Sequence, residues 1–127
     1  MAIISISLSD ESIEALEDIE RRFDLKGRSE AVRRAISIAS AEAQAIEEME
    51  GTVEGVLIIV KKDHSDPWMN LIQAKHESEI KTQLHSHLRN HKCLEVMIIS
   101  SEAEKLSKML KEIHSTGKAD YVTFVKS

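Results

Sequence analysis

The stretch "LHSHLRNHKCLE", residues 84–95, gathers metal-binding side chains in the middle of the chain. His85 and His87 stand two positions apart, and Cys93, the only cysteine of the chain, follows six positions later. Two imidazoles and one thiolate suit nickel, copper, zinc or cobalt, and they do not suit magnesium or calcium. The spacing alone is equally consistent with a polar hairpin that contains a buried cysteine.

The alternating pattern around the two histidines predicts that both side chains lie on one face of a β-sheet. Residues 79–89, "EIKTQLHSHLR", alternate as a β-strand does. His85 and His87 have the same parity, so both project from one face of the sheet, about 7 Å apart along the strand. "RNHK" then turns the chain, and Cys93 opens the next strand beside them. His91 falls in the turn, where we expect a solvent-exposed side chain.

The elements around this hairpin predict an α+β domain over residues 51–127. Residues 52–62 are apolar and β-branched, as in a buried strand, and residues 64–77 predict a helix that Ser65 or Asp66 caps. After the hairpin strands, residues 101–117 predict a second helix and residues 119–126 a last strand. This order is βαββαβ, the ferredoxin-like or ACT-type sandwich, in which both helices cover one face of the sheet.

Residues 1–50 predict a smaller module of one strand and two helices. "AIISISLS" alternates with period two, and helical patterns follow at residues 9–23 and 28–50, separated by a turn at Gly27. A single strand cannot satisfy its own backbone groups, so we expect it to pair antiparallel with the same strand of a second chain. A two-stranded ribbon above four helices fits the major groove of DNA.

Composition narrows the class of protein. The chain has 127 residues and a formal net charge of −5, with no apolar run of transmembrane length. Because a single cysteine cannot form an internal disulfide, we expect a cytoplasmic protein with no membrane partner. The acidic total does not indicate nucleic-acid binding, but basic residues cluster locally in "RRFDLKGR" and "RR". No nucleophile with a matched base and no phosphate-binding loop is visible, so we expect no enzyme.

Two motifs of the first module, the alternating "IISISLS" and the helix start "KGRSEAVRRAI", resemble the ribbon-helix-helix repressors. The resemblance implies that outward side chains of the strand read base edges and that the start of the second helix clamps a DNA phosphate. An apolar Ile3 stands where family members often place a polar or basic residue, and it can offer only apolar contact. The alternative is a dimerisation module that never touches DNA. The DNA-binding residues implied are Ile3, Ser5, Ser7, Arg28 and Ser29, with Arg33 as electrostatic help.

This module followed by an ACT-like domain with the motif H-x-H-x5-C-L-E closely resembles the nickel-responsive repressor family over essentially the whole chain. In that family, two histidines and the cysteine of one chain bind nickel in a square plane with one histidine from a helix of a neighbouring chain. The first three ligands map onto His85, His87 and Cys93. The resemblance therefore implies one Ni²⁺ per chain, although other soft or borderline divalent metals fit the same donors.

The fourth ligand is where this sequence departs from the family. Members usually carry a histidine directly after a glutamine, eleven residues before the first strand histidine. Here Gln73 is followed by Ala74, and His76 lies nine residues before His85. If two residues are missing from the connection to the strand, His76 is the ligand, and we name it as the expected one. If they are missing earlier, Ala74 takes the ligand position and His76 points elsewhere, about 200° round the helix; His64 or His91 is then a substitute.

The resemblance also implies assembly and function. The ACT-like domains of four chains would form a homotetrameric core with a ribbon-helix-helix dimer at each end, and metal binding would control binding of double-stranded operator DNA. Two alternatives remain, an ACT-type regulator that senses a small ligand and a metal-independent ribbon-helix-helix repressor with a degenerate metal site.

One more family feature concerns an ion between the two domains. The family often holds potassium there with the glutamate of "RSEAVR" and an acidic residue just after this motif. Glu30 matches the glutamate, but the other position is Arg34. We expect Arg34 to pair with Glu30 at i, i+4 and the potassium site to be lost or weakened.

Overall fold

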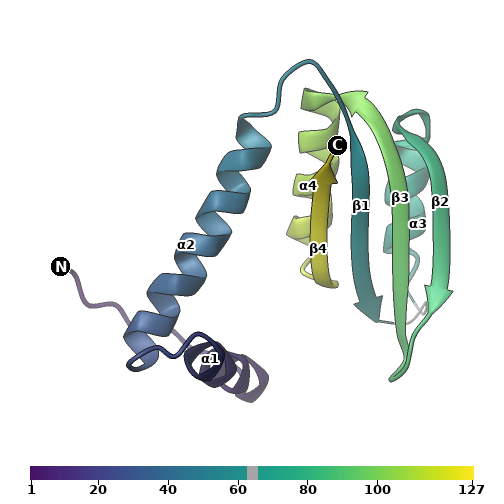
Figure 1. Cartoon of the computed structure of the whole chain (residues 1–127). Helices are drawn as coiled ribbons and strands as arrows, with labels where there is room; N and C mark the ends of the chain where they lie inside the picture. Colours follow the sequence, from purple (N-terminus) through teal and green to yellow (C-terminus); the bar gives the residue numbers. More distant parts are fainter. Residues whose placement is uncertain (63–65) are drawn as a thin grey trace. The chain divides into compact units, whose positions relative to one another are not determined.

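The computed structural model describes residues 1–62 and 66–127. The chain forms two compact units, Met1–Ile46 and Glu47–Ser127, each with its own internal contacts (Figure 1). The predicted caps and ligands at residues 63–65, Ser65 and His64 among them, lie outside the described residues.

The N-terminal unit consists of two helices joined by a tight turn. Helix α1 (Asp10–Arg22) begins after Ser9, whose side-chain oxygen accepts a hydrogen bond from the Ser12 N–H at 3.1 Å, as the sequence predicts for a cap. Helix α2 (Arg28–Glu47) follows Gly27, whose φ of +121° is a conformation that L side chains rarely adopt.

The strand predicted at the N-terminus is not formed in the single chain. Residues 1–9 have no regular secondary structure, because a strand needs a partner for its backbone groups and residues 1–46 offer none. Within these residues Ala31 alone is buried. Ile4 remains 80% exposed and Ile6 61% exposed. The alternating apolar side chains of this segment therefore pack against no other part of residues 1–46 in the single chain.

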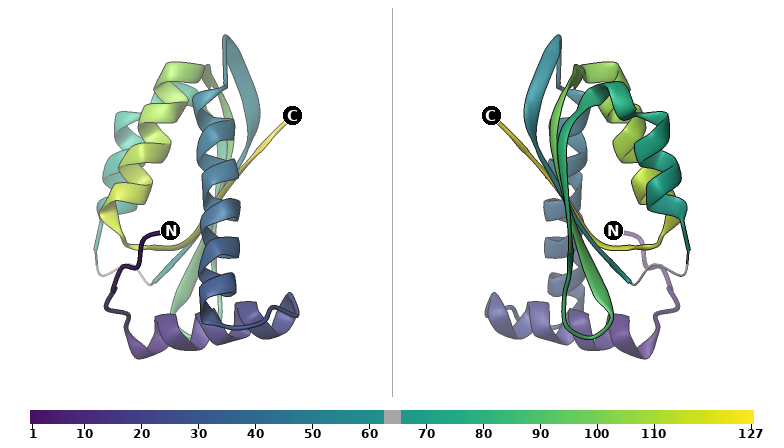
Figure 2. Two further views of the ribbon diagram at one scale, coloured as in Figure 1. Left: turned by 90° about the vertical axis from the view of Figure 1, so that its left-hand side faces the viewer. Right: turned by 90° about the vertical axis from the view of Figure 1, so that its right-hand side faces the viewer.

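The C-terminal unit has the predicted βαββαβ order. Its four strands form one antiparallel sheet in the order β2-β3-β1-β4, and α3 and α4 lie together against one face of it (Figures 1 and 2). This is an ACT-like arrangement. The elements are β1 (Thr52–Lys62), α3 (Trp68–Lys75), the 3-10 turn η1 (Glu77–Glu79), β2 (Ile80–His87), β3 (Lys92–Glu102), α4 (Ala103–Thr116) and β4 (Ala119–Lys126).

The two faces of the sheet differ in what covers them. On one face, alternate residues of β1 and β3 are buried under the helices. Helix α4 packs its apolar side against them. The opposite parity carries β-branched and aromatic side chains that stay half-buried or exposed, among them Ile98 and Tyr121. The buried core comprises Val53, Leu57, Ile59, Met69, Met97, Ile99, Leu106, Met109, Leu110 and Ile113.

The helix predicted at residues 64–77 is shorter in the structure, where α3 spans only the eight residues Trp68–Lys75. The N-cap of α3 is Pro67 and has no side-chain cap hydrogen bond, so the prediction that Asp66 occupies the cap was wrong. The Asp66 carboxylate lies just before the cap and accepts a hydrogen bond from the Trp68 N–H at 3.2 Å. At the other end, α3 stops at Lys75, and the chain reaches β2 through η1. The shortening places His76 at the end of the helix rather than within it.

Candidate metal centre

The β2–β3 hairpin brings the two histidines and the cysteine together. His87 stands directly opposite Cys93 in the antiparallel register, so their side chains share a face with that of His85. One ligand atom from each of the three lies within 4.8 Å of the other two. The histidine rings meet edge to face with centroids 5.1 Å apart, and Cys93 Sγ lies 3.8 Å from His87 Nδ1. The predicted clustering of these three residues is therefore present in the fold.

The turn of the hairpin separates His91 from this cluster. Asn90 and His91 adopt φ values of +61° and +57°, in the left-handed region used by tight turns. The Leu88 N–H donates to the Lys92 carbonyl at 2.7 Å and closes the turn. His91 is exposed there, and among the described residues the group of three metal-binding side chains does not include it.

The donor set of the cluster fits a metal ion. Zinc binds imidazole nitrogen at about 2.0–2.1 Å and thiolate sulfur at about 2.3 Å. Two donor atoms on opposite sides of such an ion are therefore roughly 4–4.5 Å apart. The observed spacing within 4.8 Å needs only a small inward movement. Cys93 is fully buried while both histidines are exposed, so an ion would have one interior anchor and two ligands at the edge strand.

Two charged side chains next to the cluster were not predicted as part of it. Glu95 stands opposite His85 in the β2–β3 register, is 4% exposed, and contacts His85 Nδ1 through Oε1. Lys61 stands opposite Cys93 in the β1–β3 register and is also 4% exposed. The signal for Glu95 is in the sequence, because it lies two residues from Cys93 and so shares its parity. Lys61 could not be found without the register of β1.

Helix α3 contributes a third neighbour to the cluster. Gln73 Nε2 donates to Glu95 Oε2 at 3.4 Å and to the Met97 sulfur at 3.7 Å. Its chain neighbour Ala74 is exposed. The side chain of residue 73 therefore faces the sheet, and residue 74 faces away from the core.

His76, the expected fourth ligand, lies elsewhere in the unit. Its side chain is buried, and Nε2 is 3.4 Å from Glu112 Oε1 on α4. Lys75 donates to the same oxygen at 2.9 Å, and this bond, with His76 as a weaker contributor, lowers the pKa of Glu112 below its usual value. The structure thus brings His85, His87 and Cys93 together but places His76 between α3 and α4.

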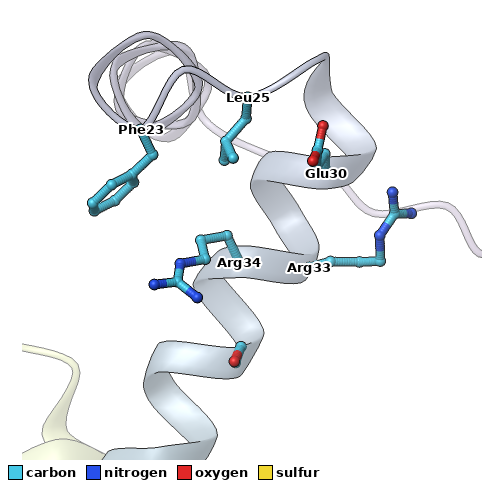
Figure 3. A pocket seen from close by; sticks show the side chains of 6 residues that line it. Phe23, Leu25, Glu30, Arg33 and Arg34 are labelled. Atoms are coloured by element: carbon cyan, nitrogen blue, oxygen red, sulfur yellow. The ribbon is translucent and has the colours of Figure 1, made fainter.

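The residues predicted to bind DNA are exposed in the N-terminal unit. Ile3 is 97% exposed, and Ser5 and Ser7 are exposed on the same segment. Arg28 and Ser29 stand at the start of α2, where the first N–H groups of a helix can bind an anion. Arg28 also lies 3.4 Å from Glu17 on α1, in a solvent-exposed ion pair of the kind that contributes little to stability. Arg33 is exposed one turn further along α2 (Figure 3).

Arg34 and Glu30 have other contacts than the pairing expected for them. The Arg34 guanidinium lies 5.9 Å from the centre of the Phe23 ring, on one side of an open hollow between the end of α1 and α2 (Figure 3). The Glu30 carboxylate accepts a hydrogen bond from the Lys26 N–H at 2.7 Å. The predicted i, i+4 ion pair between Arg34 and Glu30 was therefore wrong. Glu30 binds a backbone N–H of the turn instead, and Arg34 lies over the aromatic face of Phe23.

Comparisons with known proteins indicate the family of this chain. Residues 55–126 match the family described as the NikR C terminal nickel binding domain. Curated relatives carry the name "Putative nickel-responsive regulator". The protein of Geobacter metallireducens is 34% identical, over 85% of this chain and 79% of its own length. That of Pyrococcus horikoshii is 31% identical over 87% and 82%, and that of Halobacterium salinarum 28% over 91% and 84%.

All three of these relatives are named as regulators. Over the described residues, no helix has the length and apolar character needed to cross a membrane. The family match covers all but the first three residues of the sheet that carries His85, His87 and Cys93. By its ACT-like domain and by its similarity along most of its length, the chain belongs to the NikR family of nickel-responsive regulators.

Proposed function

We propose that this chain is a cytoplasmic, metal-responsive repressor that senses Ni²⁺ and binds double-stranded operator DNA. The observation that carries the proposal is the convergence of His85, His87 and Cys93 within 4.8 Å on one face of the hairpin. Two imidazoles and a thiolate form a donor set suited to nickel, and one site per chain follows from one hairpin per chain. Because the thiol must lose its proton and the imidazoles must be neutral, metal binding weakens in acid.

The fourth ligand is proposed to come from a neighbouring chain, as in the family. His76 can serve only if its ring leaves the contact with Glu112, because its side chain is buried in the single chain. Ala74, the exposed neighbour of Gln73, offers no donor atom. A nickel titration of the His76→Ala variant tests whether His76 is the fourth ligand. An unchanged absorption spectrum removes His76 from the site, whereas a shifted charge-transfer band makes it a ligand.

The DNA-binding part is proposed to be a ribbon-helix-helix dimer built from residues 1–50 of two chains. It is supported by the exposed apolar parity of Ile4, Ile6 and Leu8 and by the lack of a core in residues 1–46. Pairing of two such segments would bury these side chains and satisfy the strand backbones. In this arrangement Ile3, Ser5 and Ser7 contact base edges, and Arg28, Ser29 and Arg33 contact the phosphate backbone.

A tetramer through the ACT-like domains is proposed from the uncovered face of the sheet. The face opposite α3 and α4 exposes Leu84, Ile98, Tyr121 and Val125 to between 48% and 58%. A contiguous apolar surface of this kind marks an interaction site, and a second copy of the chain supplies a matching one. Metal binding would favour those arrangements of the tetramer in which both DNA-binding dimers reach one duplex.

Selection from a random pool of DNA duplexes, with and without one equivalent of Ni²⁺, tests this function. We expect enrichment of a two-fold symmetric sequence only with nickel, and no enrichment with the Cys93→Ser variant. Equal enrichment without metal would favour a metal-independent repressor, the alternative that the buried position of His76 supports. No enrichment in either condition, despite stoichiometric nickel binding, would refute DNA binding.

A further inference from the structure

Basic side chains gather at the end of the sheet that carries the metal cluster. The tip of the β2–β3 hairpin and the end of β1 lie together there (Figure 1). Among the described residues 61–62, 88–92 and 119–121, the side chains charged at neutral pH are those of Lys61, Lys62, Arg89, Lys92 and Asp120. Even with Asp63 counted from the sequence, cations outnumber carboxylates, in a chain whose net charge is −5. This end of the sheet is therefore locally positive in an acidic protein.

The strand register places these cations beside the metal-binding residues. In the β1–β3 ladder Lys61 pairs directly with Cys93. One position further, Lys62 pairs with Lys92. On the other side of β3, His87 pairs with Cys93. Because neighbouring strands lie about 4.8 Å apart, the backbone of Lys62 is roughly 10 Å from the strand of His87, about one Debye length in 0.1 M salt. A charged ligand that approaches the histidines is therefore within the field of these cations.

The exposed cations contribute little to the fold. Like charges directly opposite each other destabilise a sheet, and Lys62 and Lys92 are such a pair at the last position of the ladder. Lys92 lies 3.3 Å from Asp120 on β4, whereas Lys62 and Arg89 are exposed and form no ion pair with a described residue. Lys62, Arg89 and Lys92 thus form a basic edge whose charge can act on a ligand from solution.

A basic edge next to a metal site favours one chemical form of the metal over another. It repels a free divalent cation and attracts an anionic complex of the same metal. We propose that Lys62, Arg89 and Lys92 recruit Ni²⁺ as an anionic polycarboxylate chelate, from which the ion passes to the cluster. This inference rests on the proposed metal site and names the form in which its metal arrives.

The donors of the cluster can take the ion from such a chelate. Carboxylate oxygens suit hard cations, whereas imidazole nitrogen and thiolate sulfur suit nickel better. The bonds from the ion to the carboxylate oxygens break, and bonds to His85, His87 and the Cys93 sulfur replace them. The thiol proton passes to solvent, and the polycarboxylate leaves as an anion. His85 and His87 are exposed while Cys93 is fully buried, so the histidines meet the chelate first.

The first test uses the metal-free protein, so it does not depend on the proposed function. Citrate, a tricarboxylate, is titrated into the full chain and followed by proton–nitrogen NMR of the backbone amides. We expect saturable shifts at Lys62 and at residues 89–92. A variant with both Lys62→Gln and Arg89→Gln should bind citrate about tenfold more weakly, since each exposed ion pair contributes about threefold.

The matched control for this titration removes two cations from another exposed surface of the same unit. Lys105→Gln with Lys108→Gln on α4 changes the net charge equally and should leave citrate binding at the wild-type level. No saturable shift at the basic edge, or equal affinity of the two double variants for citrate, overturns the proposal.

The second test compares two forms of nickel by stopped-flow absorption at the thiolate-to-nickel band. Aqueous Ni²⁺ and nickel in excess citrate are each mixed with the protein at low salt and at salt high enough to shorten the Debye length to about 3 Å. We expect salt to slow association from citrate by about tenfold and to accelerate association of the aqueous ion. A net charge of −5 alone would give the opposite signs, so the sign separates the basic edge from the whole-chain charge.

The same two double variants decide whether the basic edge causes this salt dependence. Lys62→Gln with Arg89→Gln should lose it and keep the nickel stoichiometry, and the α4 control should keep both. The opposite signs in the wild type, or an unchanged salt dependence in the Lys62 and Arg89 variant, overturn the recruitment. A wild type that binds nickel in neither form refutes the proposed function, and the citrate titration still decides whether the basic edge binds a polycarboxylate.

Discussion

Two isoleucines of the N-terminal segment provide a matched test of the ribbon. Ile6 lies on the parity that we expect to face the partner chain, and Ile3 lies on the parity that we expect to face DNA. In the single chain both are exposed, 61% for Ile6 and 97% for Ile3, so neither supports the fold without a second copy. The substitutions Ile6→Ala and Ile3→Ala remove the same atoms from opposite faces of the proposed strand.

The size of the effect follows from burial and symmetry. Truncating a buried isoleucine to alanine costs about 2 kcal/mol at the lower end of the usual range. A two-fold axis places the change twice in each dimer, so Ile6→Ala should cost about 4 kcal/mol. At about 1.4 kcal/mol for each factor of ten, this is roughly a thousandfold in the equilibrium between the paired and the separated modules. Ile3→Ala should leave that equilibrium unchanged.

Amide hydrogen exchange in α1 and α2 of the full chain, at one fixed protein concentration, measures this equilibrium directly. We expect protection in both helices to fall sharply in Ile6→Ala and to stay at the wild-type level in Ile3→Ala. Equal loss in the two variants would refute the assigned parity. No loss in either would refute the ribbon itself.

Three further predictions concern packing, acid stability and DNA contact. A Cβ on Gly55 would lie 2.3 Å from the Val125 carbonyl oxygen, so Gly55→Ala should destabilise the C-terminal unit by about 1–3 kcal/mol in urea unfolding. The pKa of Glu112 is lowered chiefly by Lys75, so this contact adds stability above the ordinary carboxyl pKa of about 4.3 and loses it as pH falls through the lowered value. Lys75→Met should therefore lower the free energy of unfolding at pH 7 by at most about 1 kcal/mol, and the difference from the wild type should vanish in acid. Arg28→Ala should weaken binding to all DNA sequences and reduce the slope of affinity against salt by about one, measured by titration at several salt concentrations.

The metal cluster was predictable because its geometry depends on short-range rules. The period of two in a strand puts His85 and His87 on one face, and a tight hairpin must return Cys93 beside them. The same parity argument reaches Glu95, which lies two residues after Cys93. The βαββαβ order was equally visible, because the apolar runs and helical stripes of residues 51–127 each have a distinct period.

What the sequence could not predict depends on contacts between distant elements. Whether His76 points outward or toward α4 depends on where α3 ends and how it packs, and the structure buries it against Glu112. The partner of Arg34 depends on the turn that brings Phe23 close. The strand predicted at residues 2–9 is not formed in the single chain, since residues 1–46 offer no partner for its backbone groups.

The central claim is that His85, His87 and Cys93 bind a soft divalent ion, and a nickel titration followed by absorption spectroscopy tests it most directly. We expect one ion per chain and a thiolate-to-nickel charge-transfer band that Cys93→Ser abolishes and His85→Ala weakens. His91→Ala, which changes a histidine in the turn of the same hairpin, should bind as the wild type does. A chain that binds nickel, cobalt, copper and zinc in no fixed ratio, or a band that survives in Cys93→Ser, would contradict the metal centre.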